Sequence, residues 1–157
     1  MKFISPTKGV MNLGAVMEDI NGFVSFAPEA KYRLIVGTDS QVRNETIFVT
    51  AVIIHRVGKG ARYYYVRRVQ RAMESLRQRI YYETSLSLEI AAKITGFLAA
   101  SQVEMSPEIH LDIGDKGETR TMIKEIVGMV IGNGYATRIK PYSYGATSVA
   151  DKHTKGL

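Results

Sequence analysis

Two aspartates stand where short apolar segments end. Asp39 closes the apolar part of "LIVGTDSQV", and Asp112 closes that of "EIHLDIG". Parallel neighbouring strands deliver their carboxyl ends to the same edge of a sheet, where ligands usually bind. A single aspartate at a strand end is more often a turn former or helix cap, because its side chain bonds nearby backbone amides. Two aspartates at matching strand ends favour a functional site instead.

Three further carboxylates are candidates to join them. Glu83 and Glu89 fall in a predicted helix over residues 83–101, and Asp151 falls in the tail "SVADKHTKG". Each also has a plain explanation. Glu83 would interact favourably with the helix dipole, Glu89 would pair with Lys93 at i+4, and a charged tail is usually a solvated end.

Convergence of these side chains would have a chemical consequence. Like charges about 4 Å apart repel by roughly 4 kcal/mol at an effective dielectric constant near 20. Carboxylates that gather therefore need a divalent cation or raised pKa values. The chain has no cysteine, so a thiolate metal site and a disulfide are excluded. Ligation by oxygen alone selects Mg²⁺ or Mn²⁺ over zinc.

The elements that position these residues follow from the hydrophobic patterning, which predicts an α/β fold. Residues 71–81 are predicted as a loop or a short helix. The predicted strands cover 32–39, 45–57, 61–70, 108–114 and 135–141, and the predicted helices cover 83–101, 118–134 and 145–154. This order predicts a mixed five-stranded sheet, a three-strand antiparallel meander plus two parallel strands, with helices on both faces.

The length of 157 residues fits one domain. Residues 1–30 are predicted as an N-terminal helical extension packed on a core of residues 31–155. No apolar run approaches the roughly 18 residues that span a bilayer, and the N-terminus lacks the apolar segment of a signal peptide. We therefore expect a cytoplasmic protein that does not enter membranes.

The motifs resemble the ribonuclease H-like superfamily, whose members carry Asp, Glu, Asp and a final Asp at corresponding places. The shared features are the element order and "TDSQ", "LEIAAKITGFL", "LDIG" and a late aspartate. More closely, the chain resembles the bacterial YkuK-type family in "FISPTKG", "IVGTDSQ", "GNGY" and "SYGATSVADKHTKG". This closer resemblance covers nearly the whole chain.

The resemblance implies phosphodiester hydrolysis at a site that holds two Mg²⁺ or Mn²⁺ ions. It assigns the ligands to Asp39, Glu89, Asp112 and Asp151, with Glu83 in reserve for Glu89. His153 would help to move protons or release product. Lys152 and Lys155 would hold a phosphate.

A basic, tyrosine-flanked segment offers the best candidate for binding nucleic acid. The formal net charge of +6 and the pI of about 9.5 favour an anionic partner. Arginine contacts phosphates, and tyrosine stacks on bases. The alternative is an exposed edge strand kept soluble by its charge. The segment "YYYVRRVQRAMESLRQRIYY" contains Arg67, Arg68, Arg71, Arg77 and Arg79.

We take as the main hypothesis a divalent-metal-dependent nuclease that acts on nucleic acid. One alternative is a non-catalytic nucleic-acid-binding or scaffolding module on the same fold. Another is a structural partner protein whose acidic residues are surface charges. The sequence leaves open whether the substrate is RNA, DNA, a hybrid or a junction, and a junction would call for a homodimer.

Overall fold

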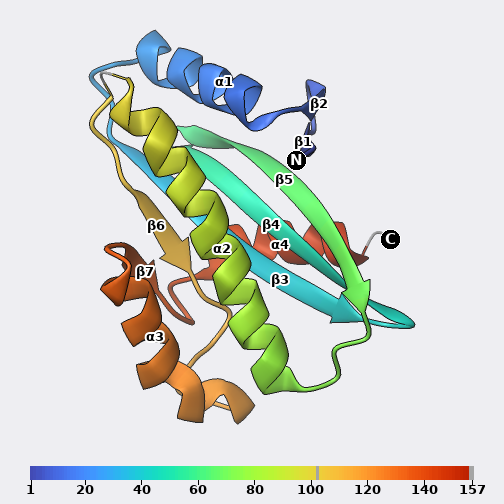
Figure 1. Cartoon of the computed structure of the whole chain (residues 1–157). Coiled ribbons are helices and arrows are strands. Elements are labelled where there is room, and N and C mark those ends of the chain that lie inside the picture. The colour runs from blue at the N-terminus through green and yellow to red at the C-terminus, as the bar shows by residue number, and fades with distance from the viewer. Residues whose placement is uncertain (102, 156–157) are drawn as a thin grey trace.

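A computed structural model describes residues 1–101 and 103–155, and the side chains of these residues except 144–147 and 155. Among these residues, seven strands form one mixed sheet with the order β2-β1-β5-β4-β3-β6-β7 (Figure 1). The strands are β1 (Phe3–Ser5), β2 (Gly9–Met11), β3 (Tyr32–Val42), β4 (Glu45–Arg56), β5 (Gly60–Arg71), β6 (Pro107–His110) and β7 (Ala136–Arg138).

The centre of the sheet follows the predicted pattern. β3, β4 and β5 are antiparallel neighbours joined by short turns, and Gly58 and Gly60 take positive φ angles in the second turn. β6 pairs with β3 in parallel, and β7 pairs with β6 in parallel. The three-strand meander and the two parallel strands are therefore confirmed.

The predicted total of five strands is wrong, because the N-terminal segment adds two. β1 and β2 form a hairpin, and Ile4 of β1 pairs with Tyr65 of β5. Each added strand has three residues, which is too short to show a convincing period-two alternation. The extension over residues 1–30 is thus a hairpin followed by a helix.

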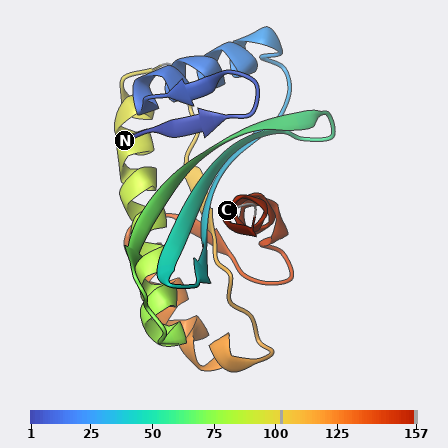
Figure 2. The ribbon, with the colours of Figure 1, turned by 90° about the vertical axis from the view of Figure 1, so that its right-hand side faces the viewer.

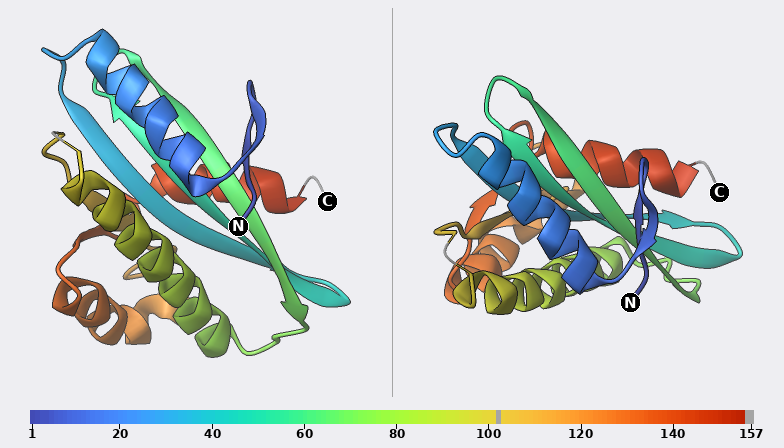
Figure 3. Two further views of the ribbon diagram at one scale, coloured as in Figure 1. Left: turned by 45° about the horizontal axis from the view of Figure 1, so that its top comes forward. Right: turned by 90° about the horizontal axis from the view of Figure 1, so that it is seen from above.

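Helices cover both faces of the sheet, as predicted (Figure 2). The helices are α1 (Leu13–Phe26), α2 (Leu76–Ala99), α3 (Ile123–Gly132) and α4 (Tyr144–Lys155), with a short 3₁₀ helix over Glu118–Met122 before α3. α1, α2 and α3 lie on one face, and α4 crosses the other face alone (Figure 3). The described residues contain no helix long and apolar enough to cross a membrane.

α2 begins earlier than expected, at Leu76. Its N-cap is Ser75, whose side chain accepts a hydrogen bond from the Gln78 backbone N–H. Residues 76–81 therefore belong to the helix, and Glu83 lies two turns inside it. Favourable interaction with the helix dipole no longer explains a carboxylate at this position.

Two large apolar clusters hold α1, α2 and α3 to the sheet. The first joins β3, β4 and β5 to α1 and α2, and the second joins β6 to α2 and α3. Fully buried members include Val16, Ile20, Leu34, Val36, Ile54, Ile94, Ile109, Ile126 and Val130. At roughly 1.5–3 kcal/mol per buried aliphatic side chain, this packing keeps the strand ends in register.

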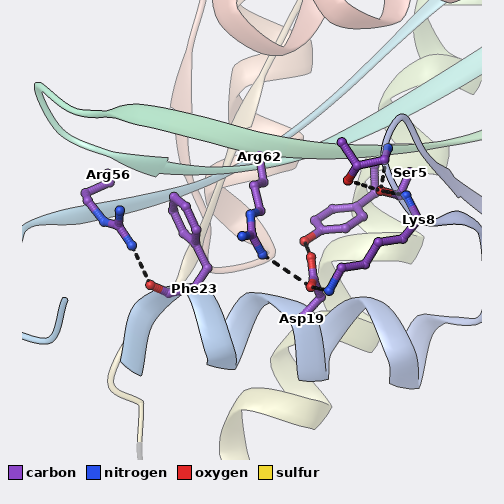
Figure 4. Close-up of polar contacts among 8 residues, drawn as sticks. Ser5, Lys8, Asp19, Phe23, Arg56 and Arg62 are labelled. Carbon is purple, nitrogen blue, oxygen red and sulfur yellow. Dashed lines mark hydrogen bonds and ion pairs between the residues drawn. The ribbon is translucent and has the colours of Figure 1, made fainter. Parts of the chain in front are cut away.

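Asp19 ties the N-terminal segment to β5 (Figure 4). Its carboxylate accepts hydrogen bonds from Lys8 and from the buried Tyr64 hydroxyl, and Arg62 lies 3.3 Å away. Burial raises the pKa of Asp19, but these donors and cations outweigh it, so the pKa lies below its usual value. Burial and Asp19 together raise the pKa of Tyr64.

We predict that Asp19→Ala lowers the free energy of unfolding by about 1–3 kcal/mol, because it leaves a buried hydroxyl and two cations without their partner. Urea denaturation measures the change. Glu18→Ala, at the exposed neighbouring position, should stay within about 0.5 kcal/mol of the wild type. Equal effects of the two substitutions would contradict the anchoring role of Asp19.

Candidate functional site

Carboxylates from separate elements meet beside the carboxyl-terminal half of β3. Asp39 of β3, Asp112 and Asp151 of α4 line one open hollow of about 220 Å³, together with Ser148. Asp112 follows the end of β6 by two residues. The expected meeting of Asp39 with Asp112 is thus present, and α4 adds the third carboxylate.

The surroundings of Asp39 disfavour the charged form of its carboxyl. Burial, together with the charges of Asp112 and Asp151, raises the pKa of its carboxyl to about 7, against the opposing effect of a backbone hydrogen bond from Ser40. Asp39 and Asp151 also share a hydrogen bond. Two carboxyl groups can form such a bond only when one of them carries a proton.

Glu83 reaches the same region from α2, on the opposite face of the sheet. Its side chain is buried, with 7% of the residue exposed, and its Oε2 accepts a hydrogen bond of 2.5 Å from the Ser40 hydroxyl. Burial raises the pKa of Glu83 well above its usual value, and Asp39 and Asp112 add to this effect against the opposing influence of Ser40 and Arg79. Glu83 therefore belongs electrostatically to the cluster.

Glu89, the predicted helix ligand, lies elsewhere. Its carboxylate is 3.5 Å from Arg68 and 3.9 Å from Lys93, and 40% of its side chain is exposed. Six residues separate Glu83 from Glu89, which is about 9 Å along a helix. The structure brings Glu83, and not Glu89, to the aspartates, and Glu89 has the i+4 partner that its spacing suggested.

Polar side chains that sequence reasoning did not single out surround the carboxylates. Lys140 forms an ion pair of 2.8 Å with Asp112. Beneath the site, the Thr38 hydroxyl bonds to Thr50 at 2.8 Å and to Ser87 at 2.7 Å. Ser87 lies four residues after Glu83 on α2, a spacing that would have revealed it once the helix start was known.

His153 faces away from the carboxylates. Its ring stacks on Tyr65 with centroids 3.8 Å apart, and its Nε2 is 3.1 Å from the Tyr63 hydroxyl. Burial lowers the pKa of His153, with a further contribution from Lys152. Two residues along a helix correspond to a rotation of about 200°, which explains why Asp151 and His153 contact different partners.

The basic segment is divided between the two faces of the sheet. Arg67 aligns with Val49, which aligns with Asp39, so Arg67 shares a face with Asp39 at a distance of about two strand spacings, roughly 10 Å between Cα atoms. Arg68 points to the α2 face and pairs with Glu89.

The remaining basic candidates have separate surroundings. Arg77 pairs with Glu125 at 2.8 Å, and the buried Nε of Arg79 has no hydrogen-bond partner among the described residues. Arg71 and Lys152 are exposed. The side chain of Lys155 lies outside the described residues.

The polar side chains of this site are chemically suited to bind a hard cation, because they offer carboxylate and hydroxyl oxygens as ligands. As positioned, however, the His, Asp and Glu side chains of residues 1–101 and 103–155 form no group of three or more with metal-binding geometry. In this arrangement the Lys140 ammonium offsets the charge of Asp112, and the raised pKa of Asp39 favours its neutral form.

Comparisons with known proteins agree with this fold. A family model described as ribonuclease H-like matches residues 15–155, and the chain therefore belongs to the ribonuclease H-like family. More particularly, it is 39% identical over 166 residues to the uncharacterized protein YkuK of Bacillus subtilis (strain 168), covering 98% of this chain and 96% of that protein. The YkuK-type resemblance of the motifs is confirmed. No solved structure matches the chain.

The raised pKa of Asp39 predicts a stability that depends on pH. The pKa is 3.8 in its ordinary state and about 7 in the fold, so the folded chain binds more protons between these values and loses stability as pH rises through this window. Asp39→Asn removes this loss. In EDTA the variant should be more stable than the wild type at pH 8, by an amount limited by about 1.4 kcal/mol per pKa unit, and the difference should shrink toward pH 4.

Urea denaturation at several pH values measures this difference. The control is Glu104→Gln, a substitution at an exposed carboxylate, which should leave the pH profile unchanged. A stability difference between Asp39→Asn and the wild type that does not change with pH would contradict the burial of an uncompensated carboxyl.

Proposed function

We propose that this protein is a divalent-metal-dependent nuclease that hydrolyses phosphodiester bonds of nucleic acid. The observation that carries the proposal is the gathering of Asp39, Asp112 and Asp151 around one hollow, with the buried Glu83 coupled to them electrostatically. Such a gathering destabilises the fold unless a cation or protons compensate it. Its position beside the carboxyl-terminal parts of β3 and β6, where ligands of such sheets usually bind, supports a functional role.

Mg²⁺ or Mn²⁺ fits this set by its chemistry, since every donor is a hard oxygen. Asp39, Glu83, Asp112 and Asp151 are the residues that would hold the ions. When bound, the ions supply an activated water and neutralise charge on the leaving oxygen. Because the raised pKa of Asp39 favours its protonated form, a proton on this carboxyl would have to leave as a cation binds.

The remaining residues of the site orient its carboxylates. Ser40 fixes one oxygen of Glu83 by its hydrogen bond. Lys140 holds Asp112 through an ion pair in which 56% of the lysine side chain is exposed. An exposed lysine at this position is also able to turn toward a substrate phosphate.

Arg67 is best placed to hold the nucleic acid. It is exposed and lies on the face of the sheet that carries Asp39. A phosphate on Arg67 and a second phosphate at the carboxylates would be about 10 Å apart, which a strand spans with one to two nucleotides. Of the other arginines of the segment, Arg68 pairs with Glu89 and Arg77 pairs with Glu125, and Arg71 lies four residues farther along β5.

Cleavage of labelled single strands, duplex DNA, RNA/DNA hybrid and four-way junction tests the function, with Mn²⁺ and with EDTA. Glu83→Gln should reduce metal-dependent cutting at least about 100-fold, because even outer partners of metal ligands contribute 10–100-fold. Glu89→Gln is the matched control on the same helix and should cut within a few-fold of the wild type. Loss of cutting in Glu89→Gln with retention in Glu83→Gln would reverse our assignment of the helix ligand.

The wild type could bind a nucleic acid in a gel-shift assay and cut none of the panel. That result would contradict the nuclease proposal for these substrates and support a non-catalytic binding module. Cutting of the junction alone would make a homodimer the expected state, since two strands must then be cut. The panel also identifies the substrate class.

Arg67→Ala should weaken nucleic-acid binding several-fold and reduce the slope of log K against log salt by about 1, as for the loss of one phosphate contact. Fluorescence anisotropy at several salt concentrations measures both quantities. Arg77→Ala is the control, because Arg77 pairs with Glu125 of α3 on the far face. Equal loss of affinity in both variants would indicate a general charge effect and contradict a specific contact at Arg67.

A further inference from the structure

A lysine from the segment after β7 contacts one of the carboxylates of the site. The Nζ of Lys140 lies 2.8 Å from Oδ1 of Asp112. Asp112 lines the open hollow together with Asp39, and the charge of Asp112 helps to raise the pKa of Asp39. The Lys140 ammonium therefore pairs with a carboxylate that takes part in the repulsion at the site.

The backbone determines where the side chain of Lys140 begins. The pairing of β6 with β7 continues past the strand ends, because the Lys140 N–H donates a hydrogen bond of 2.8 Å to the Ile113 carbonyl. Gly114 permits this approach, since a Cβ at that position would lie only 3.0 Å from the Cβ of Lys140. The stem of the lysine is thus held beside the segment that carries Asp112.

The ammonium end of Lys140 is able to leave Asp112 while the backbone stays in place. The lysine side chain is 56% exposed and the aspartate side chain 28% exposed. A lysine carries its charge on a flexible four-carbon stem, and its ammonium does not need one fixed hydrogen-bond geometry. Ion pairs between partly exposed side chains are weak, so another cation is able to replace the lysine at Asp112.

A divalent cation in the open hollow would compete with this ammonium. Such a cation is attracted by Asp39 and Asp151 as well as by Asp112, since all three line the hollow, and it carries two positive charges where the lysine carries one. The two cations also repel each other when both lie against Asp112. The ammonium must therefore move away as the cation binds, and its presence lowers the affinity of the hollow for the cation.

We propose that Lys140 is a built-in competitor of the divalent cation, which pairs with Asp112 in the metal-free protein and is displaced when the cation binds. This inference rests on the proposed function, because it takes the carboxylates as metal ligands. Lys140 acts through Asp112 and is therefore a positioning residue. It offsets charge while the hollow is without a cation, and it raises the cation concentration at which the hollow fills.

Calorimetric titration of the full chain with Mn²⁺ tests the competition. Lys140→Met removes the charge and should bind Mn²⁺ at least about fivefold more tightly than the wild type, which is the lower end of the usual coupling between two binding events. Lys140→Arg keeps the charge and should bind no more tightly than the wild type. Lys93→Met is the matched control, because it removes a lysine of similar exposure, 48%, from an ion pair with Glu89. It should bind as the wild type does.

Urea denaturation gives a second measurement, which separates competition from damage to the fold. In EDTA, Lys140→Met should unfold at a lower urea concentration than the wild type, because Asp112 has lost the partner that offsets its charge. Saturating Mn²⁺ should remove or reverse this difference, since the variant that binds the ion more tightly gains more stability from it. A packing defect would instead persist in Mn²⁺ and would not tighten the binding of the ion.

The outcomes distinguish failure of this inference from failure of the proposed function. Equal Mn²⁺ affinity in the wild type and in Lys140→Met would overturn the inference alone. Tighter binding by Lys140→Arg as well would also overturn it, because the charge would then not be the cause. Absence of Mn²⁺ binding at millimolar concentration in the wild type and in every variant would overturn the proposed function and this inference together.

Discussion

Electrostatic repulsion between carboxylates is the constraint on which the site depends. The fold brings acidic side chains from β3, α2, α4 and the segment after β6 to one place. No single element could do this, because neighbouring side chains of one helix or strand diverge. β3 makes it possible, since it pairs with β4 on one side and with β6 on the other. Its central position places Asp39 between the elements that supply the other carboxylates.

The two faces of the sheet contribute different parts of the site. The α2 face supplies a buried carboxylate, Glu83, held by Ser40 in dry surroundings. The α4 face supplies the open hollow and the exposed Arg67. A buried side and an accessible side meeting at one strand end give the site both rigidity and access for a polymer.

The strand order of the core was predictable because long strands with short turns leave few arrangements. Asp39 and Asp112 were predictable for the same reason, since they lie in and just after the carboxyl-terminal parts of two parallel neighbouring strands, β3 and β6. The choice between Glu83 and Glu89 was not, because it depended on where α2 begins, and that start rests on one serine cap. The N-terminal hairpin was missed because three-residue strands carry almost no pattern.

The division of the arginines, by contrast, was available from the sequence. Arg67 and Arg68 are adjacent in one strand, so their side chains must point to opposite faces. Treating the segment as one basic patch ignored this alternation. For His153, no local pattern indicated that it would stack on Tyr65, since the contact joins residues far apart in the chain.

The buried hydroxyls beneath the site add a property of their own. Thr38 bonds to both Thr50 and Ser87, and each hydroxyl is able to donate and to accept. The direction of this chain therefore reverses when three O–H bonds rotate, while the oxygen atoms stay in place. The dipole beside the carboxylates can change sign as their charge changes, so the interior polarises in response to the site without any movement of the backbone.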